Sequence, residues 1–263
     1  MSGTPKLRIA GVSRTFAGPR GQSTPALAPV DLDVAPNDFI TILGPSGCGK
    51  STLLRIVAGL DRPSAGKALL NGREIRGPGR DRGMVFQSYT LFPWLTVGEN
   101  IAFGLRERGV PAAEQRDAVR LYLARMGLSG FENHLPRQLS GGMQQRTAIA
   151  RALANEPEIL LMDEPFGALD NQTRALMQEL LLSVWERDQK TILFVTHDIE
   201  EAIFMASRVV VMTARPGRIK ADIAVDLPHP RAYTLKTSPE FNALKARLTE
   251  EIRVEAAKVA EAG

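Results

Sequence analysis

The hydrophobic pattern at the start of the chain is typical of β-strands. Residues 7–16 and 30–34 are β-like, and a turn-rich segment, residues 18–24, separates them. This order predicts an antiparallel hairpin. Residues 39–43 form a continuous apolar run, as expected of a strand buried on both faces. A glycine-rich turn and a helical pattern, residues 50–58, follow, so strand, loop and helix succeed one another.

Similar buried strands are predicted further along, with helical patterns between them, at residues 83–86, 158–162 and 191–196. Strands that alternate with helices favour a largely parallel sheet. The β-like pattern returns at residues 209–212 and 219–225. The sequence therefore predicts an α/β fold with a mainly parallel sheet and an antiparallel β subdomain at the N-terminus.

The middle of the chain predicts helices and no strand, over about residues 88–155. Thr96 can cap one helix, and Ser140 precedes a long amphipathic run. A third helix is expected at residues 112–126, with apolar residues at Ala118, Leu121, Tyr122 and Met126. We interpret this segment as a helical subdomain inserted in the sheet.

A final helix is predicted after Ser238, with apolar residues at Phe241, Leu244, Leu248, Ile252 and Val259. These patterns predict one main domain, residues 1–227, that contains the helical subdomain. A short helical extension, residues 228–263, follows it.

Composition narrows the class of protein. Of 263 residues, 44% are hydrophobic and 24% are charged, values that are ordinary for a globular protein with a large core. The net charge of +4 comes from 33 basic and 29 acidic residues that are mixed along the chain, which indicates a solvated surface rather than a polyanion-binding patch. Cys48 is the single cysteine, which excludes an internal disulfide and fits a reducing compartment.

No stretch of the sequence predicts export or membrane insertion. Residues 1–10 lack the apolar core of a secretory signal, and no later run approaches the ~18–20 apolar residues that span a bilayer. Any association with a membrane is therefore expected to go through a partner.

A phosphate-binding pattern, GxxxxGK[ST], lies between the buried strand 39–43 and the following helix. Glycines let backbone N–H groups turn toward phosphate oxygens, and the helix adds its positive N-terminal end. Lys50 supplies a cation for the β and γ phosphates, and the Ser51 hydroxyl can ligate Mg²⁺. The pattern predicts a P-loop NTPase core, with ATP held by Gly44, Pro45, Ser46, Gly47, Cys48, Gly49, Lys50, Ser51 and Thr52. A glycine-rich turn without a ligand is the plain alternative, and Cys48 is either a small loop residue or a regulatory thiol.

Two carboxylates, Asp163 and Glu164, follow the apolar strand 158–162 directly. In a parallel sheet this strand ends at the same edge as the phosphate loop. Asp163 is suited to hold Mg²⁺, and Glu164 can polarise a water for attack on the γ phosphate. Alone, the pair could be a strand-terminal turn with two solvated acids; together with the phosphate loop it predicts hydrolysis.

A further motif, residues 139–146 (LSGGMQQR), resembles the signature of the ATP-binding cassette (ABC) family. Ser140 is placed to cap a helix, while Gly141 and Gly142 expose backbone N–H groups, which makes a second anion site at a helix N-terminus. A capped helix and nothing more is the alternative. The resemblance implies that this site closes on the nucleotide of a second cassette, so that two ATP molecules lie between two chains.

Other residues match the family in chain order. Gln87 resembles its glutamine loop, which implies contact with Mg²⁺ and the attacking water, and Asp170 in Ala-Leu-Asp resembles its D-loop. His197 resembles the switch histidine that contacts the γ phosphate, although it could be an ordinary strand-end histidine. Phe16 stands where the family usually has an aromatic residue that stacks on adenine, and a core phenylalanine is the alternative. His134 and His229 lack such context and are interpreted as surface residues.

The kind of cassette protein follows from weaker features. Tyr89, Leu91, Phe92 and Trp94, which we call the aromatic segment, lie where relatives receive a coupling helix of the membrane subunit; simple packing is the alternative. The sequences of residues 91–97, 214–219 and 226–231 resemble those of the importer branch that handles nitrate, sulfonates and taurine.

The resemblance implies transmembrane permease subunits as partners, a second ATPase subunit that makes a homodimer, and an extracytoplasmic solute-binding protein reached through the permease. It implies a place on the cytoplasmic face of the cell membrane and no nucleic acid partner. A non-transport ABC ATPase acting on nucleic acid or ribosomes is the rival; the coiled-coil insertion, second cassette or basic linker usual there is not found in the sequence. A small-molecule kinase is disfavoured by the signature motif.

Overall fold

The computed structural model describes residues 4–18 and 22–262, with side chains up to residue 258. It divides into two compact units, one of Met1–Gly79 with Leu182–Gly263 and the other of Arg80–Leu181. Part of the predicted turn, residues 19–21, and the side chain of Val259 lie outside the described residues. The predicted domain limits at residues 88–155 and 227 stay predictions.

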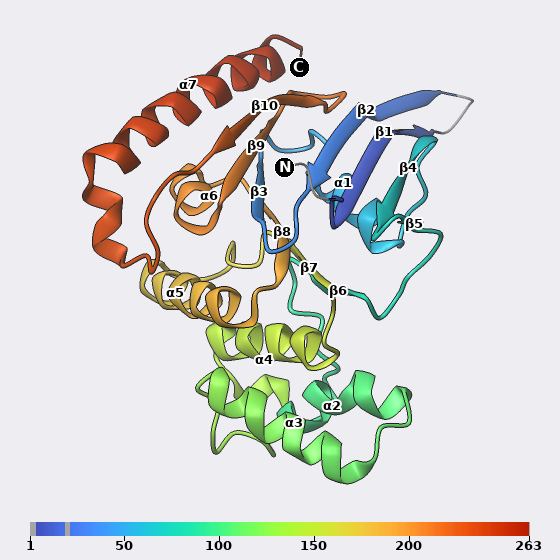
Figure 1. Cartoon of the computed structure of the whole chain (residues 1–263), viewed down its shortest axis with the longest axis vertical. Coiled ribbons are helices and arrows are strands. Elements are labelled where there is room, and N and C mark those ends of the chain that lie inside the picture. The colour runs from blue at the N-terminus through green and yellow to red at the C-terminus, as the bar shows by residue number, and fades with distance from the viewer. Residues whose placement is uncertain (1–3, 19–21, 263) are drawn as a thin grey trace. The chain divides into compact units, whose positions relative to one another are not determined.

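The first unit begins with an antiparallel sheet of four strands in the order β2-β1-β4-β5. Its members are β1 (Leu7–Ala17), β2 (Ser23–Val34), β4 (Ala65–Leu70) and β5 (Arg73–Glu74) (Figure 1). β1 and β2 form the predicted hairpin, but β2 begins seven residues before the predicted residue 30. The hydrophobic pattern did not predict this early start because the first three side chains of β2 are exposed. Exposure also explains why β4 and β5 were missed: the first half of β4 and both residues of β5 carry no buried side chain.

Buried strands form the rest of this unit's sheet structure. β3 (Phe39–Leu43) pairs in parallel with β8 (Thr191–Thr196) on one side and with β9 (Arg208–Met212) on the other. β10 (Ile219–Ala224) pairs antiparallel with β9. Every side chain of β3 and β8 is buried, as the continuous apolar runs predict.

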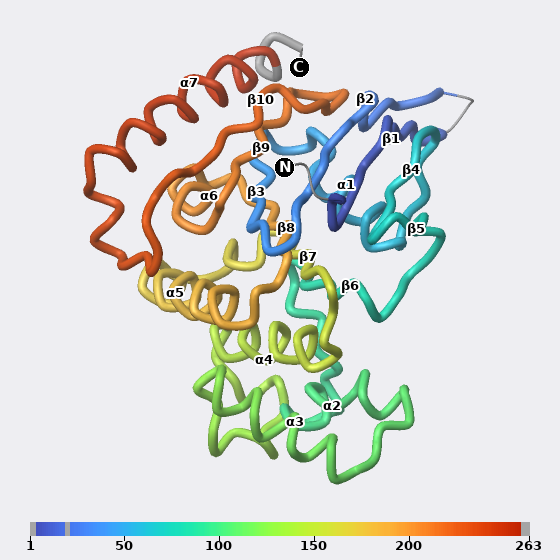
Figure 2. The backbone as a smooth tube through the Cα atoms, viewed as in Figure 1, coloured from blue at the N-terminus to red at the C-terminus, as the bar shows by residue number. Residues whose placement is uncertain are grey.

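Three helices pack against these strands. α1 (Lys50–Ala58) contacts β8 and β2, and α6 (Ile199–Met205) contacts β3. After a 3₁₀ turn at Tyr233–Thr237, α7 (Pro239–Ala262) packs on α6 and β9, and Figure 2 draws it in red up to the grey end of the chain. It buries Phe241 and Leu248 as predicted, while Leu244 and Ile252 are half-buried.

The second unit contains a parallel strand pair and a group of helices. β6 (Arg82–Val85) pairs with β7 (Ile159–Asp163). α2 (Val97–Glu107), α3 (Ala112–Arg125) and α4 (Gly141–Ala154) pack on one another, with a 3₁₀ turn at Pro136–Gln138 before α4. α5 (Asn171–Asp188) begins here, and the division between the units falls within it.

Local sequence accounts for the start of α2, but only in part for the buried face of α3. Thr96 caps α2 as predicted, and with Glu99 it forms a capping box in which each side chain accepts the other residue's N–H. In α3 the predicted apolar face is wrong at Leu121, which is 45% exposed. Tyr122 and Met126 are buried as predicted, and Val119 and Leu123 complete the buried face in place of Leu121.

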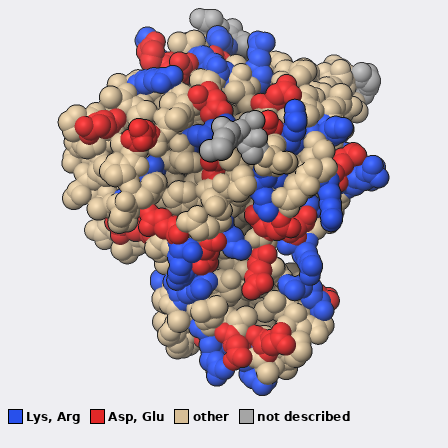
Figure 3. Space-filling model, in the orientation of Figure 1, with Lys and Arg blue, Asp and Glu red and all other residues tan. Residues whose placement is uncertain are grey.

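Among the described residues, no helix is both long enough and apolar enough to cross a bilayer. On the face drawn in Figure 3, basic and acidic side chains are interspersed, as the mixed charges of the sequence predict.

Candidate functional site

The loop between β3 and α1 has the backbone shape of a phosphate cradle. Gly47 and Gly49 have φ of 73° and 102°, which is left-handed backbone that only glycine adopts without strain. Gly49 also precedes α1 as its N-cap. A Cβ on Gly49 would lie 2.6 Å from Leu27 Cδ2 and 2.9 Å from the Ala26 carbonyl oxygen, so the loop packs too closely on β2 for any side chain there.

Lys50 turns back over this loop. Its ammonium donates to the carbonyl oxygens of Gly44 (2.8 Å) and Pro45 (2.9 Å), and the residue is only 5% exposed. A cation held this close to the loop N–H groups makes a strongly anion-attracting position. Ser51 follows it and is exposed at the start of α1.

The Cys48 side chain is buried in the loop. Burial raises the pKa of its thiol, although the nearby Lys50 ammonium opposes this. The thiolate, which is the reactive form, is therefore disfavoured, and this does not fit a regulatory thiol.

Two other predicted residues lie in the same unit. His197 follows β8 directly and is exposed. The turn after it is fixed, because the Asp198 N–H donates to Thr196 Oγ1 and the Asp198 carboxylate caps α6 by accepting from the Glu201 N–H. Phe16 lies near the end of β1, 38% exposed, with the Arg14 guanidinium 4.5 Å from the ring centre. A ring so exposed does not fit the core alternative.

The second unit brings Gln87 and Glu164 together. Asp163 is the last residue of β7, and Glu164 after it has φ of 43°, a left-handed conformation that costs about 1–3 kcal/mol in a non-glycine residue and clusters at functional sites. Gln87 Nε2 donates to Glu164 Oε2 over 3.4 Å. The strained backbone thus aims the carboxylate at the residue predicted to share its water.

The signature motif begins α4 in this unit. Ser140 is its N-cap and accepts a long hydrogen bond, 3.4 Å, from the Met143 N–H. The glycines permit close approach: a Cβ on Gly141 would lie 2.9 Å from the Tyr89 hydroxyl, and one on Gly142 would lie 2.5 Å from Thr173 Cγ2. Gly141 is half-buried and Gly142 is buried, so neither position at this helix start has room for a side chain.

Asp170 does more than the resemblance implies. Its carboxylate accepts the N–H groups of Gln172 (3.1 Å) and Thr173 (3.0 Å), which caps the start of α5. Hydrogen bonds from Thr173 lower the pKa of this exposed carboxyl. A capping role thus stands beside the predicted contact with the nucleotide of a second chain.

The aromatic segment is only partly open. Phe92 packs against Phe103, with ring centres 4.3 Å apart, whereas Trp94 is 72% exposed. Two residues that sequence analysis missed hold the segment in place. The buried Asn100 accepts the Phe92 N–H and donates to the Leu95 carbonyl, and Arg151 donates to the Thr90 carbonyl. An amide on the buried face of α2 was the available signal for Asn100.

The predicted site residues thus form two groups. The phosphate loop, His197 and Phe16 lie in the first unit; Gln87, Asp163, Glu164, the signature motif and Asp170 lie in the second. In the described part of the chain, no group of three or more His, Cys, Asp or Glu side chains is arranged to hold a metal ion. The hydroxyl of Ser51 and the oxygens of Asp163 and Gln87 still suit Mg²⁺, which prefers oxygen ligands and is usually bound by one or two carboxylates together with phosphate oxygens and waters.

Comparison with known proteins identifies the fold and its family. Residues 27–167 match the ABC transporter family. The structure superposes with a TM-score of 0.75 on the ATP-binding cassette MJ0796 in a dimeric post-hydrolysis state bound to ADP and Pi; the match has 35% identity and covers 84% of this chain and all of that one. The predicted P-loop α/β fold is therefore confirmed.

Two relatives carry names that match the predicted branch. The nitrate import ATP-binding protein NrtD of Synechocystis is 47% identical, over 93% of this chain and 97% of its own. The aliphatic sulfonates import ATP-binding protein SsuB of Bacillus licheniformis is 49% identical over 87% of each chain. An uncharacterized ABC transporter ATP-binding protein of Methanocaldococcus jannaschii is 51% identical over 96% of this chain and 93% of its own. The chain therefore belongs to the ABC transporter family, as one of its ATP-hydrolysing subunits.

Proposed function

We propose that this ATPase powers the import of a small anion such as nitrate, a sulfonate or taurine. One observation carries the ATPase part of the proposal: a phosphate loop closed by Lys50, a strained Glu164 bonded to Gln87, and a glycine-flanked helix start at Ser140 occur in one chain. The identities of 47% and 49% with nitrate and sulfonate import proteins support this class of cargo.

Each residue of the proposed site has a chemical task. The loop N–H groups and Lys50 bind the β and γ phosphates, and Phe16 stacks on adenine. Ser51, Asp163 and Gln87 would hold Mg²⁺, which offsets charge on the phosphates. Glu164 accepts a proton from the attacking water, and His197 contacts the γ phosphate.

The ATP site is proposed to be complete only between two copies. The start of α4 and Asp170 of one chain would close on the nucleotide held by the phosphate loop of the other. Replacing Ser140 by arginine fills this anion site with a long cation. We expect Ser140→Arg to abolish ATP hydrolysis by the assembled transporter while the isolated chain still binds ATP.

A matched control is Ser129→Arg, at an exposed serine of the same unit, which should keep wild-type hydrolysis. Full ATPase activity of the Ser140→Arg transporter would contradict the two-chain site.

Permease subunits are the proposed partners, at the inner face of the cell membrane, with a solute-binding protein acting through them. Trp94 is the exposed member of the aromatic segment and is the proposed contact for a coupling helix. The test is purification of the tagged chain from detergent-solubilised membranes. A polytopic membrane protein should be recovered, and Trp94→Ala should reduce its yield, whereas Leu176→Ala, at another exposed apolar side chain, should not. Reproducible recovery of DNA-binding or ribosomal proteins, without a membrane protein, would contradict a role in transport.

A further inference from the structure

The loop between β9 and β10, residues 213–218, lies directly against the phosphate loop; we call it the hairpin loop. Arg215 Nε donates to the Gly47 carbonyl oxygen over 3.1 Å. The Gly217 N–H donates to the Ala26 carbonyl, 2.9 Å, and its own carbonyl accepts from the Ala28 N–H, 3.0 Å. A Cβ on Gly217 would lie 1.9 Å from the Cys48 carbonyl oxygen, so the two backbones are in contact.

The Arg215 bond acts on a peptide group of the phosphate cradle. The Gly47 carbonyl belongs to the same planar peptide as the Cys48 N–H. A charged donor on the carbonyl fixes the orientation of that plane and polarises the N–H, which makes it a better donor. In this structure the Cys48 N–H donates a long bond, 3.4 Å, to the Pro45 carbonyl, so a phosphate oxygen can replace this acceptor at little cost.

The other side of the hairpin loop is held by α7. The Ala214 N–H donates to Glu255 Oε2 over 3.0 Å, and Glu255 is 1% exposed. Its other oxygen is paired with Lys258 (2.8 Å) and Lys220 (3.2 Å). Residue 214 is thus fixed by the C-terminal helix, while residue 215 reaches the phosphate loop.

We propose that Arg215 is a positioning residue that raises nucleotide affinity by holding the Gly47 peptide, and that Glu255 of α7 keeps Arg215 in place. The C-terminal helix then sets how tightly the chain holds ATP, although it does not touch the nucleotide. The proposal rests on the assignment of residues 44–52 as the phosphate-binding loop.

The test is titration of the purified full chain with Mg-ATP and with ADP by calorimetry. Arg215→Ala should weaken binding of both nucleotides by about three- to tenfold, the range for an exposed charge-assisted hydrogen bond. Arg218→Ala, at an exposed arginine of the same loop, is the matched control and should bind as wild type. A thermal melt separates this effect from loss of folded protein, since a merely structural bond would lower the melting temperature and leave the affinity of the folded fraction unchanged.

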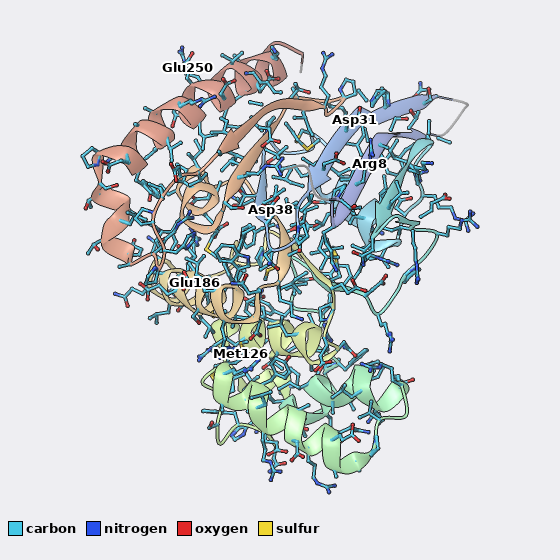
Figure 4. The ribbon with its side chains drawn as sticks, viewed as in Figure 1. Arg8, Asp31, Asp38, Met126, Glu186 and Glu250 are labelled. Atoms are coloured by element: carbon cyan, nitrogen blue, oxygen red, sulfur yellow. The ribbon has the colours of Figure 1, made fainter. Side chains whose placement is uncertain are left out.

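The second arm tests the link to α7. Glu255→Gln should weaken ATP binding about two- to fivefold in an otherwise native chain. In a chain that already carries Arg215→Ala it should cause little further loss of ATP affinity, because both changes act on one contact. Glu250→Gln on the same helix should have no effect on ATP binding, because this carboxylate is 60% exposed and pairs with Arg253. Figure 4 labels Glu250 on α7.

The outcomes separate this inference from the proposed function. Lys50→Ala should abolish ATP binding, and wild-type affinity in that variant would overturn the phosphate loop assignment itself. If Lys50→Ala abolishes ATP binding while Arg215→Ala binds ATP as wild type, the proposal that Arg215 raises nucleotide affinity is overturned. Additive effects of the Arg215 and Glu255 substitutions would overturn the link through α7.

Discussion

At the scale of single residues, the phosphate loop depends on positions that exclude a side chain. Gly49 combines a left-handed φ with a Cβ position only 2.6 Å from Leu27 Cδ2. The motif alone predicts a glycine here for phosphate access, and the structure adds packing on β2 as a second reason. Leu27 could not be linked to Gly49 from the sequence, since the contact joins different elements.

We expect Gly49→Ala to lower the free energy of unfolding by about 1–3 kcal/mol, because alanine is strained at this φ and meets Leu27 and Ala26. Denaturant unfolding measures it. The control is Gly77→Ala, where no atom lies within 4 Å of the new Cβ and the change should stay within about 0.5 kcal/mol. Equal stability of the two variants would contradict the claim that Gly49 is packed too closely for a side chain.

Glu164 is the residue on which hydrolysis is proposed to depend. Glu164→Gln removes the base but keeps the size of the side chain, so phosphate release should fall by about 10²- to 10⁴-fold while ATP affinity is kept. A phosphate release assay and a binding titration measure the two effects. Glu179→Gln, at an exposed residue of α5, should leave both unchanged. Normal turnover in Glu164→Gln would require another base.

Sequence motifs named the residues proposed to touch nucleotide, because that chemistry needs fixed residue types at fixed spacings. They did not name Arg151, Arg215 or Glu255, which act by holding other segments. Arg215 and Gly47 are 168 positions apart, and no pattern in the chain links them. Such supporting residues become visible only when the fold brings the segments together.

At the scale of elements, burial decided which strands and helices could be predicted. β3 and β8 are buried at every position, and the sequence located both within a residue. β4 and β5 carry few buried side chains, so their hydrophobic pattern is weak and they were missed. Leu121 shows a related error: helical spacing alone fits more than one face of α3, and packing selects the face with Val119.

The contact between α7 and the hairpin loop should show in the dependence of stability on pH. Burial disfavours the charged form of Glu255, but hydrogen bonds from Lys258, the Ala214 N–H and Lys220 outweigh it and hold the pKa of this carboxyl at about 2. Glu251 also pairs with Lys220, at 3.0 Å. Because the folded pKa lies below the unfolded value of about 4.3, the stabilisation is complete above that pH and is lost as pH falls toward 2.

Glu255→Gln should therefore lower the free energy of unfolding by about 2–3 kcal/mol at pH 7. The difference from wild type should shrink steadily below about pH 4.3 as the wild-type carboxylate is protonated. Denaturant unfolding of both proteins across this range measures it. A difference that does not change with pH would mean that the charge of Glu255 contributes nothing.

At the scale of the whole molecule, the chain divides its proposed ATPase residues between two compact units. The phosphate loop and His197 belong to one, while Glu164 and the signature motif belong to the other. The sequence predicted the fold and the family well, since both are encoded in motifs and in buried strands. It could only suggest the cargo, because the features of residues 91–97, 214–219 and 226–231 lie outside the proposed ATPase motifs.

The most direct test of the central claim is uptake of labelled nitrate, taurine and an alkanesulfonate by the cells that make this chain, compared with cells in which it carries Glu164→Gln at the same level. The account predicts that uptake of at least one of these anions depends on the native chain and is lost in the variant. Equal uptake of all three anions in both strains, with hydrolysis by the variant abolished, would contradict small-anion import.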